Sequence, residues 1–144
     1  MENNSLKTRI IDGVEQVYDP VRHRYVKITP EEWVRQQTIL YLHHNCHYPY
    51  ELMCVEGSIS INGMSRRCDI IVYGHDASPR MIVECKKEDI KINQKVVDQA
   101  CRYNIALHVP YLLLTNGLQQ VCLKVDFTNL QLQQIAIPHW DSLT

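Results

Sequence analysis

The sequence lacks the signatures of several common hydrolase and membrane classes. It has no glycine-rich loop of the kind that cradles nucleotide phosphates, so a P-loop nucleotide hydrolase is unsupported. It also has no Gly-x-Ser-x-Gly elbow, which α/β serine hydrolases carry. No apolar run reaches the roughly 18 residues that span a bilayer, and residues 1–5 lack the basic flank and apolar segment of a secretory signal. We therefore expect a cytoplasmic location with no membrane contact.

An excess of positive charge is also missing. The chain has 15 Lys and Arg against 16 Asp and Glu, for a formal net charge of −1. An independent, non-specific DNA-binding protein is normally basic, because its affinity comes from neutralising phosphates. To bind nucleic acid well, this protein would need a local basic patch, a partner protein or dimerisation. The candidates for a local basic patch are Arg66, Arg67, Lys87 and Lys91.

The six cysteines contain no Cys-x-x-Cys pair. Several of them alternate with apolar residues in predicted strands, where a free cysteine behaves as a small hydrophobic side chain. Disulfides are not expected in a cytosolic protein. His43 and His47 stand four residues apart on a predicted helix, a spacing that can bind zinc, but no second ligand pair follows at finger spacing. A zinc-stabilised scaffold is therefore the weakest alternative.

The 144 residues are expected to form one domain with a substantial core, with residues 1–28 as an N-terminal extension of short strands. Thr29, Pro30 and Glu32 form a helix start with a capping box, which predicts a helix to about residue 45. A second helix is predicted over 93–108. Strands are predicted over residues 25–28, 50–61, 67–73, 80–86, 110–115 and 120–125, with a hairpin turn at Asn62-Gly63. The 120–125 strand is expected at the sheet edge, and the tail from residue 130 is expected to be a weak strand or irregular. The fold class is α/β, a mixed central sheet flanked by helices.

The predicted hairpin of residues 67–73 and 81–86 carries the most informative side chains. Asp69 lies near the start of one strand, and Glu84 and Lys86 project to one face of the other. We expect the three groups to meet at one end of the sheet. Glu-x-Lys on an exposed strand is usually a solvated ion pair, but Ile82 and Val83 indicate a central strand, where buried charge needs a reason.

Two carboxylates held together repel each other unless a cation lies between them. Mg²⁺ or Mn²⁺ fits such a site because both ions prefer carboxylate oxygens and water. A divalent ion at Asp69 and Glu84, with the backbone carbonyl of Cys85, could activate water and bind a scissile phosphate. Lys86 could orient the water or offset phosphate charge.

Here the residues also carry a resemblance. Arg67-Cys68-Asp69 followed by Val83-Glu84-Cys85-Lys86 is similar to the PD-(D/E)xK motif of restriction-endonuclease-like nucleases, with Cys68 at the variable proline position. Three further segments, residues 29–36, 98–103 and 114–117, resemble the N-terminal nuclease domain of type I restriction enzyme R subunits. The resemblance covers about residues 20–130. It departs from that family in having no motor domain after the nuclease motif.

The resemblance implies roles for three more residues. A glutamate on the first helix approaches the metal carboxylates in that family, which points to Glu32, although the capping box already explains this residue. Glu56 is a rival third carboxylate and Glu51 a weaker one. Gln99 and Tyr103 match a Gln-x-x-x-Tyr pair that lies near the site in the family; otherwise they would be a polar surface pair on one helix face.

The leading hypothesis is a Mg²⁺- or Mn²⁺-dependent DNA endonuclease of the restriction-endonuclease-like fold. The expected partners are DNA and restriction-modification subunits or a motor protein, and a homodimer would allow both strands to be cut. The alternative is a non-catalytic module that keeps the fold and assembles with a separately encoded partner. The small negative net charge favours this alternative.

Overall fold

The structure is a computed structural model that describes residues 5–143. Its elements follow in the order β1 (Thr8–Ile11), β2 (Val14–Asp19), β3 (Arg24–Lys27), α1 (Pro30–Cys46), η1 (Tyr50–Leu52), β4 (Met53–Val55), β5 (Ser58–Ile61), β6 (Met64–Arg67), β7 (Ile70–Tyr73), β8 (Pro79–Cys85), α2 (Gln94–Leu107), β9 (Tyr111–Thr115), β10 (Gln120–Asp126), β11 (Gln131–Ile135) and η2 (Trp140–Ser142).

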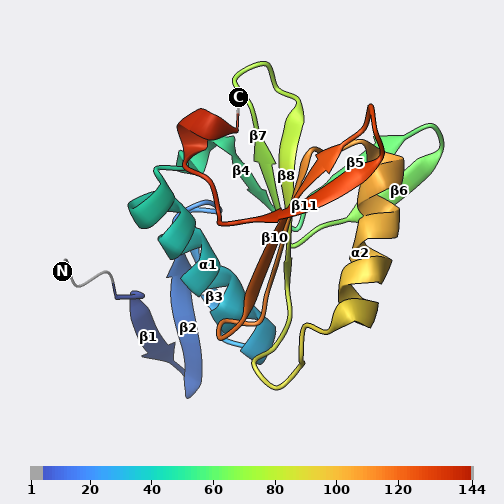
Figure 1. Cartoon of the computed structure of the whole chain (residues 1–144). Helices are drawn as coiled ribbons and strands as arrows, with labels where there is room; N and C mark the ends of the chain where they lie inside the picture. The colour runs from blue at the N-terminus through green and yellow to red at the C-terminus, as the bar shows by residue number, and fades with distance from the viewer. Residues whose placement is uncertain (1–4, 144) are drawn as a thin grey trace.

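A six-stranded mixed sheet forms the centre, in the order β11-β10-β9-β8-β7-β4. Strands β8 and β9 are parallel, and the other neighbours in this sheet are antiparallel. Helix α1 lies on one side of the sheet and α2 on the other (Figure 1). The parallel pair follows from α2, since a crossover helix returns the chain to the same end of the sheet. The predicted α/β fold class is confirmed.

Both helices begin and end where local chemistry favours it. The Thr29 hydroxyl accepts a hydrogen bond from the Glu32 N–H at 3.0 Å, and Pro30 takes the first helical position of α1. Asn93 caps α2 in the same way. His47 and His108 end the two helices in the left-handed conformation. Each end lies within one residue of its prediction.

Two apolar clusters hold the helices on the central sheet. On the α1 side, Val34, Ile39 and Leu42 pack against alternate residues of β7, β8 and β9. On the α2 side, Ala100 and Leu107 pack against the other set of alternate residues in the same strands, which point to the opposite face of the sheet. Strands β8 and β9 are buried on both faces, as expected of a parallel pair under two layers of helix.

Two strand predictions were wrong in part. The predicted strand over 50–61 is broken at Glu56, whose φ of 58° lies in the left-handed region, and only β4 joins the central sheet. Strand β5 turns through Asn62-Gly63 into β6 and forms a separate two-stranded hairpin. Strand β10 was expected at the sheet edge, but β11 pairs outside it. A polar strand with weak alternation, such as β11, leaves little signal in the sequence.

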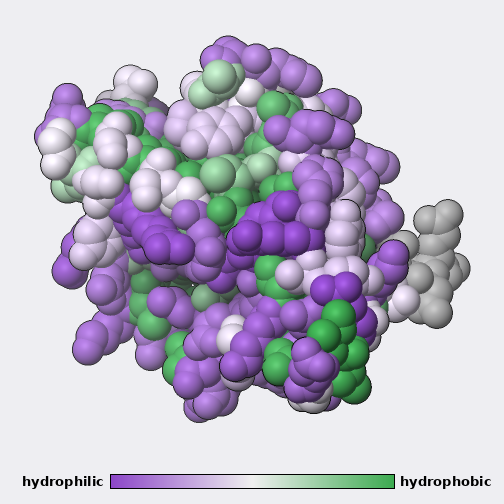
Figure 2. Space-filling view, turned by 180° about the vertical axis from the view of Figure 1, so that it is seen from behind, coloured by the Kyte–Doolittle hydropathy of each residue, from purple (hydrophilic) through white to green (hydrophobic). Residues whose placement is uncertain are grey.

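Residues 8–27 form a separate antiparallel sheet, β1-β2-β3, beside α1 and away from α2 (Figure 1). Short strands were predicted in this extension, and residues 1–4 of it lie outside the described residues. The β1–β2 hairpin exposes Ile10, Ile11 and Val14. Figure 2 shows one of several hydrophobic patches at the lower right of the molecule, on the side where the N-terminal sheet lies. Strand β2 of this small sheet contacts α1, and Val21 in the β2–β3 turn packs against the apolar cluster on the α1 side of the central sheet.

All six cysteines are free thiols, and five of them are buried. This agrees with their expected use as small apolar side chains. Within residues 5–143, no helix is both long enough and apolar enough to cross a membrane.

Candidate functional site

The predicted motif lies on the two central strands. Asp69 directly precedes β7, Glu84 is the last residue but one of β8, and Lys86 directly follows β8. The Asp69 Oδ2 accepts a hydrogen bond from the Cys85 N–H at 2.8 Å. The Lys86 N–H donates to the Thr115 carbonyl at 2.8 Å, which extends the parallel pairing with β9 by one residue. The fold therefore brings Asp69 to the Glu84-x-Lys86 end of β8.

Glu84 projects toward the α2 side of the sheet, because it shares a face of β8 with Ile82. Its side chain is buried, and its carboxylate contacts the guanidinium of Arg66 on β6. That guanidinium in turn lies 4.4 Å from the ring centre of Tyr103 on α2. Glu84 and Tyr103, predicted to share a site, are thus connected through Arg66.

Gln99 and Tyr103 lie one turn apart on α2 and are both exposed. They line one groove between α2 and the β5–β6 hairpin, together with Met64, Gln94, Lys95, Asp98 and Arg102. The structure therefore places Gln99 beside Tyr103, on the side of the sheet that Glu84 faces.

The Asp69 carboxylate has a different cationic partner. Its Oδ1 lies 3.9 Å from the Nη2 of Arg35 on α1. The two motif carboxylates are thus paired with arginines from different elements, Asp69 with α1 and Glu84 with β6. Within residues 5–143, no group of three or more His, Cys, Asp or Glu side chains is arranged to hold a metal ion. A divalent ion shared by Asp69 and Glu84 stays a prediction.

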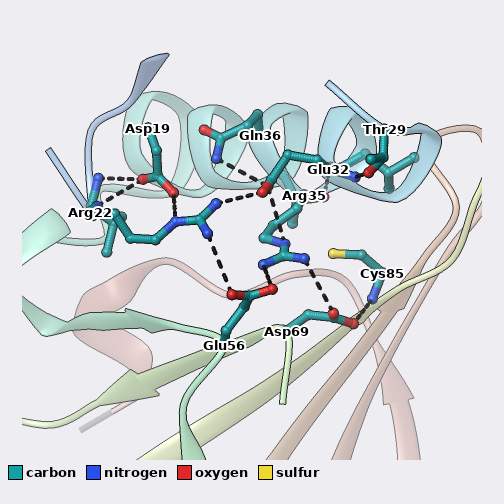
Figure 3. A network of polar contacts seen from close by, with 12 residues as sticks. Asp19, Arg22, Thr29, Glu32, Arg35, Gln36, Glu56, Asp69 and Cys85 are labelled. Atoms are coloured by element: carbon teal, nitrogen blue, oxygen red, sulfur yellow. Dashed lines mark hydrogen bonds and ion pairs between the residues drawn. The ribbon is translucent and has the colours of Figure 1, made fainter. Parts of the chain in front are cut away.

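Glu32 lies in a buried network of charged side chains under the first turns of α1 (Figure 3). Its carboxylate contacts Arg22 at 2.5 Å and Arg35 at 3.3 Å, and it accepts a longer bond from Gln36 at 3.4 Å. Half of the expected capping box is present, since the Glu32 N–H bonds to Thr29. The Glu32 carboxylate contacts the two arginines, so a capping box does not account for the direction of this side chain.

Glu56, the rival third carboxylate, belongs to the same network. It contacts Arg22, Arg35 and Arg67 at 3.6, 3.4 and 3.3 Å. Partial burial acts to raise the pKa of Glu56, but the charges and hydrogen bond of Arg35 and the charges of Arg22 and Arg67 outweigh it, so the pKa is lowered. Glu51, the weaker candidate, lies exposed in η1.

The comparisons with known proteins concern the family and the fold. The family model for the type I restriction enzyme R protein N terminus (HSDR_N) matches residues 30–138. The chain belongs to the HSDR_N family. A solved fragment of a protein assigned as an HsdR subunit of a type I restriction enzyme from Vibrio vulnificus YJ016 has a similar fold, with a TM-score of 0.51 and 20% sequence identity. The similarity covers 73% of this chain but only 22% of that one. No curated protein matches the sequence.

Cys85 lies within the HSDR_N match, between the two charged residues of the motif. Its side chain packs on the α1 side, and burial raises the pKa of its thiol to about 12. The sulfur therefore stays protonated near neutral pH and is a poor ligand for a hard cation. The backbone carbonyl is the group of Cys85 that suits such a cation, and its role as a ligand stays a prediction.

The two histidines of the zinc alternative have separate partners in this HSDR_N chain. His43 Nδ1 lies 2.8 Å from the Tyr48 carbonyl, and its ring stacks on Tyr50 at 3.6 Å between centres. His47 is the cap residue of α1 and lies beside His139, 5.2 Å between ring centres. These contacts give both histidines structural roles at the end of the helix.

Sequence reasoning missed the arginines of the buried network, Arg22 and Arg35, and their partner Asp19. Asp19-Pro20-Val21-Arg22 does carry a local turn signal. Arg35 is inconspicuous because charged residues are expected on helices. Arg22 also lies outside the region that the HSDR_N family model matches. Nothing local in the sequence shows that it reaches Glu32, ten residues away.

Proposed function

We propose that this chain is a Mg²⁺- or Mn²⁺-dependent DNA endonuclease domain that hydrolyses phosphodiester bonds. Its membership of the HSDR_N family supports the reaction class. One contact carries the site: the hydrogen bond from the Cys85 N–H to Asp69, which draws the first acid of the motif to the strand that holds Glu84 and Lys86.

The donor set suits a hard divalent cation. Asp69, Glu84 and the Cys85 carbonyl offer only oxygen atoms, which Mg²⁺ and Mn²⁺ prefer. The carboxylates of Asp19, Glu32, Glu56 and Asp69 outnumber by one the guanidinium groups that they contact, which belong to Arg22, Arg35 and Arg67. This surplus of negative charge favours a further cation. When bound, such an ion lowers the pKa of its water and polarises the phosphate.

The other residues act around this centre. Lys86, half-buried after β8, would orient the attacking water and offset charge on the phosphate. Glu32 supports the acidic set from α1. Tyr103 and Gln99 border the groove on the side of the sheet that Glu84 faces, and they would contact the DNA backbone.

A second candidate function is an assembly module that keeps the fold without cutting DNA. The observation that favours it is that Asp69 and Glu84 both have arginine partners already. The chain also spans about a fifth of the length of the HsdR fragment it resembles. In either case the proposed partners are DNA and the subunits of a restriction-modification system, and a homodimer would let duplex DNA be cut on both strands.

Calorimetric titration with Mn²⁺ separates the two functions. The wild-type protein should bind the ion, and Asp69→Asn should weaken the affinity by at least about tenfold, because a charged ligand is lost. Asparagine can still accept the Cys85 N–H through its amide oxygen, so the fold is retained. Asp89→Asn, an exposed change in the loop after β8, is the matched control. A wild-type protein that neither binds Mn²⁺ nor cuts DNA would establish the assembly module.

Arg66 should compete with the metal for Glu84. Arg66→Gln removes the guanidinium from the carboxylate, so Mn²⁺ affinity should rise about fivefold, the equivalent of ~1 kcal/mol for one ion pair. Arg67→Gln is the control, because Arg67 is its neighbour on β6 but contacts Glu56 and is mostly exposed. Equal affinities in the wild type and both variants would show that Glu84 is not a metal ligand.

A further inference from the structure

The turn between β2 and β3 is built around one buried carboxylate. Asp19 is 0% exposed, and its Oδ1 accepts hydrogen bonds from the N–H groups of Val21 and Arg22 at 2.7 and 3.0 Å. Its Oδ2 accepts the Arg22 Nε at 2.5 Å. Burial acts to raise the pKa of Asp19, but the bonds from Arg22 and Val21 outweigh it and the pKa is lowered. Asp19 therefore fixes the direction of the Arg22 side chain.

The free end of that side chain points into the candidate site. Because Nε is held by Asp19, the two terminal nitrogens of Arg22 face away from the turn. Nη2 lies 2.5 Å from the Glu32 Oε1, and Nη1 lies 3.6 Å from Glu56 (Figure 3). The Arg22 side chain is only 14% exposed, so these contacts are poorly screened by water.

Glu32 is the member of the site that Arg22 controls. Its backbone N–H is bonded to Thr29, and a free carboxylate at this position would turn back to the cap. Arg22 draws it instead toward Arg35, 3.3 Å away, and Arg35 is the arginine that lies at Asp69. A continuous chain of charged contacts thus runs from the N-terminal sheet to the motif aspartate (Figure 3).

We propose that Arg22 is a positioning residue of the nuclease site and that Asp19 clamps it so that Glu32 faces the acidic centre. The N-terminal sheet is then part of the site, although its turn lies before the matched family region of residues 30–138. The inference rests on the proposed function. A lysine cannot replace Arg22, because one ammonium cannot bond Asp19 and Glu32 through separate, rigidly held nitrogens.

The test is steady-state Mg²⁺-dependent cleavage of plasmid DNA by the full chain. Arg22→Gln and Arg22→Lys should both lower kcat by about 10- to 100-fold, the usual effect of losing a residue that orients a ligand. KM for DNA should stay within about twofold, because the half-buried Arg22 contacts carboxylates and not the solvent-facing groove. Arg24→Gln, an exposed change at the start of β3, should cut like the wild type.

Each other outcome overturns a stated claim. A raised KM with unchanged kcat would make Arg22 a DNA contact, and unchanged kinetics with a lowered melting temperature would make it purely structural. Full activity in Arg22→Lys would overturn the clamp. If both variants fail to fold by circular dichroism, Arg22 serves folding and the positioning role is overturned. If the wild type itself does not cut DNA, the proposed function fails and the inference fails with it. If the wild type cuts and the Arg22 variants cut equally well, only the inference fails.

Discussion

Glu84→Gln should lower Mg²⁺-dependent DNA cleavage on the order of 10³-fold, because the amide keeps the size of the side chain but is an uncharged and weaker ligand for a divalent cation. Lys86→Met should have a comparable effect by removing the ammonium that is proposed to offset charge on the phosphate. Glu84 is 8% exposed and lies on a strand buried on both faces, so a substitution of equal size avoids a cavity. The measurement is the rate of plasmid nicking under single-turnover conditions.

Glu88→Gln and Lys27→Met are the controls. Both side chains are exposed, Glu88 in the loop after β8 and Lys27 at the end of β3, and they carry the same charges as Glu84 and Lys86. They should cut at the wild-type rate. The site assignment would be wrong if Glu84→Gln and Lys86→Met also cut at that rate while melting at the same temperature.

Asp19→Asn should cause the largest loss of stability, about 3 kcal/mol in the free energy of unfolding, because it leaves the buried Arg22 without a charged partner at Nε. Urea unfolding at neutral pH, followed by circular dichroism, measures the change. Asp12→Asn is the control, since this exposed residue in the β1–β2 turn has a φ of 51° that asparagine also favours.

The same carboxylate predicts the pH dependence. The pKa of folded Asp19 lies below its ordinary value, since the bonds from Arg22 and Val21 outweigh the opposing effect of burial. Its contribution is therefore complete above the unfolded pKa of ~3.9 and disappears as pH falls through the lower folded value. Wild-type stability should drop more steeply than that of Asp19→Asn below about pH 4. Parallel curves in acid would contradict the role of Asp19.

The sequence predicts the parts of this fold that local chemistry decides. Thr29 and Asn93 cap their helices, and Asn62-Gly63 makes a hairpin, because each depends on a few adjacent residues. The break at Glu56 was missed because a glutamate in the left-handed conformation has no local signal. The edge position of β11 was missed because it depends on the pairing of β11 with β10 in the folded sheet, which the sequence of β11 does not indicate.

The candidate site divides in the same way. The positions of Asp69, Glu84 and Lys86 at one end of two adjacent strands follow from periodicity and a turn. Their cationic partners do not, because Arg35 and Arg66 come from a helix and a hairpin that long-range packing brings to the strands. Electrostatic pairing across elements is the information that a single sequence lacks.

The charged network around Arg22 and Arg35 also has a consequence for when the proposed activity could arise. Its members come from the β2–β3 turn, α1, the bend before β5 and the start of β7, and β8 completes its pairing only after α2 has crossed to β9. No short piece of the chain contains all of them, and contacts between segments so distant in the sequence slow folding. A chain that is only partly synthesised or partly folded would lack these contacts, so the proposed activity would arise only in the fully folded protein.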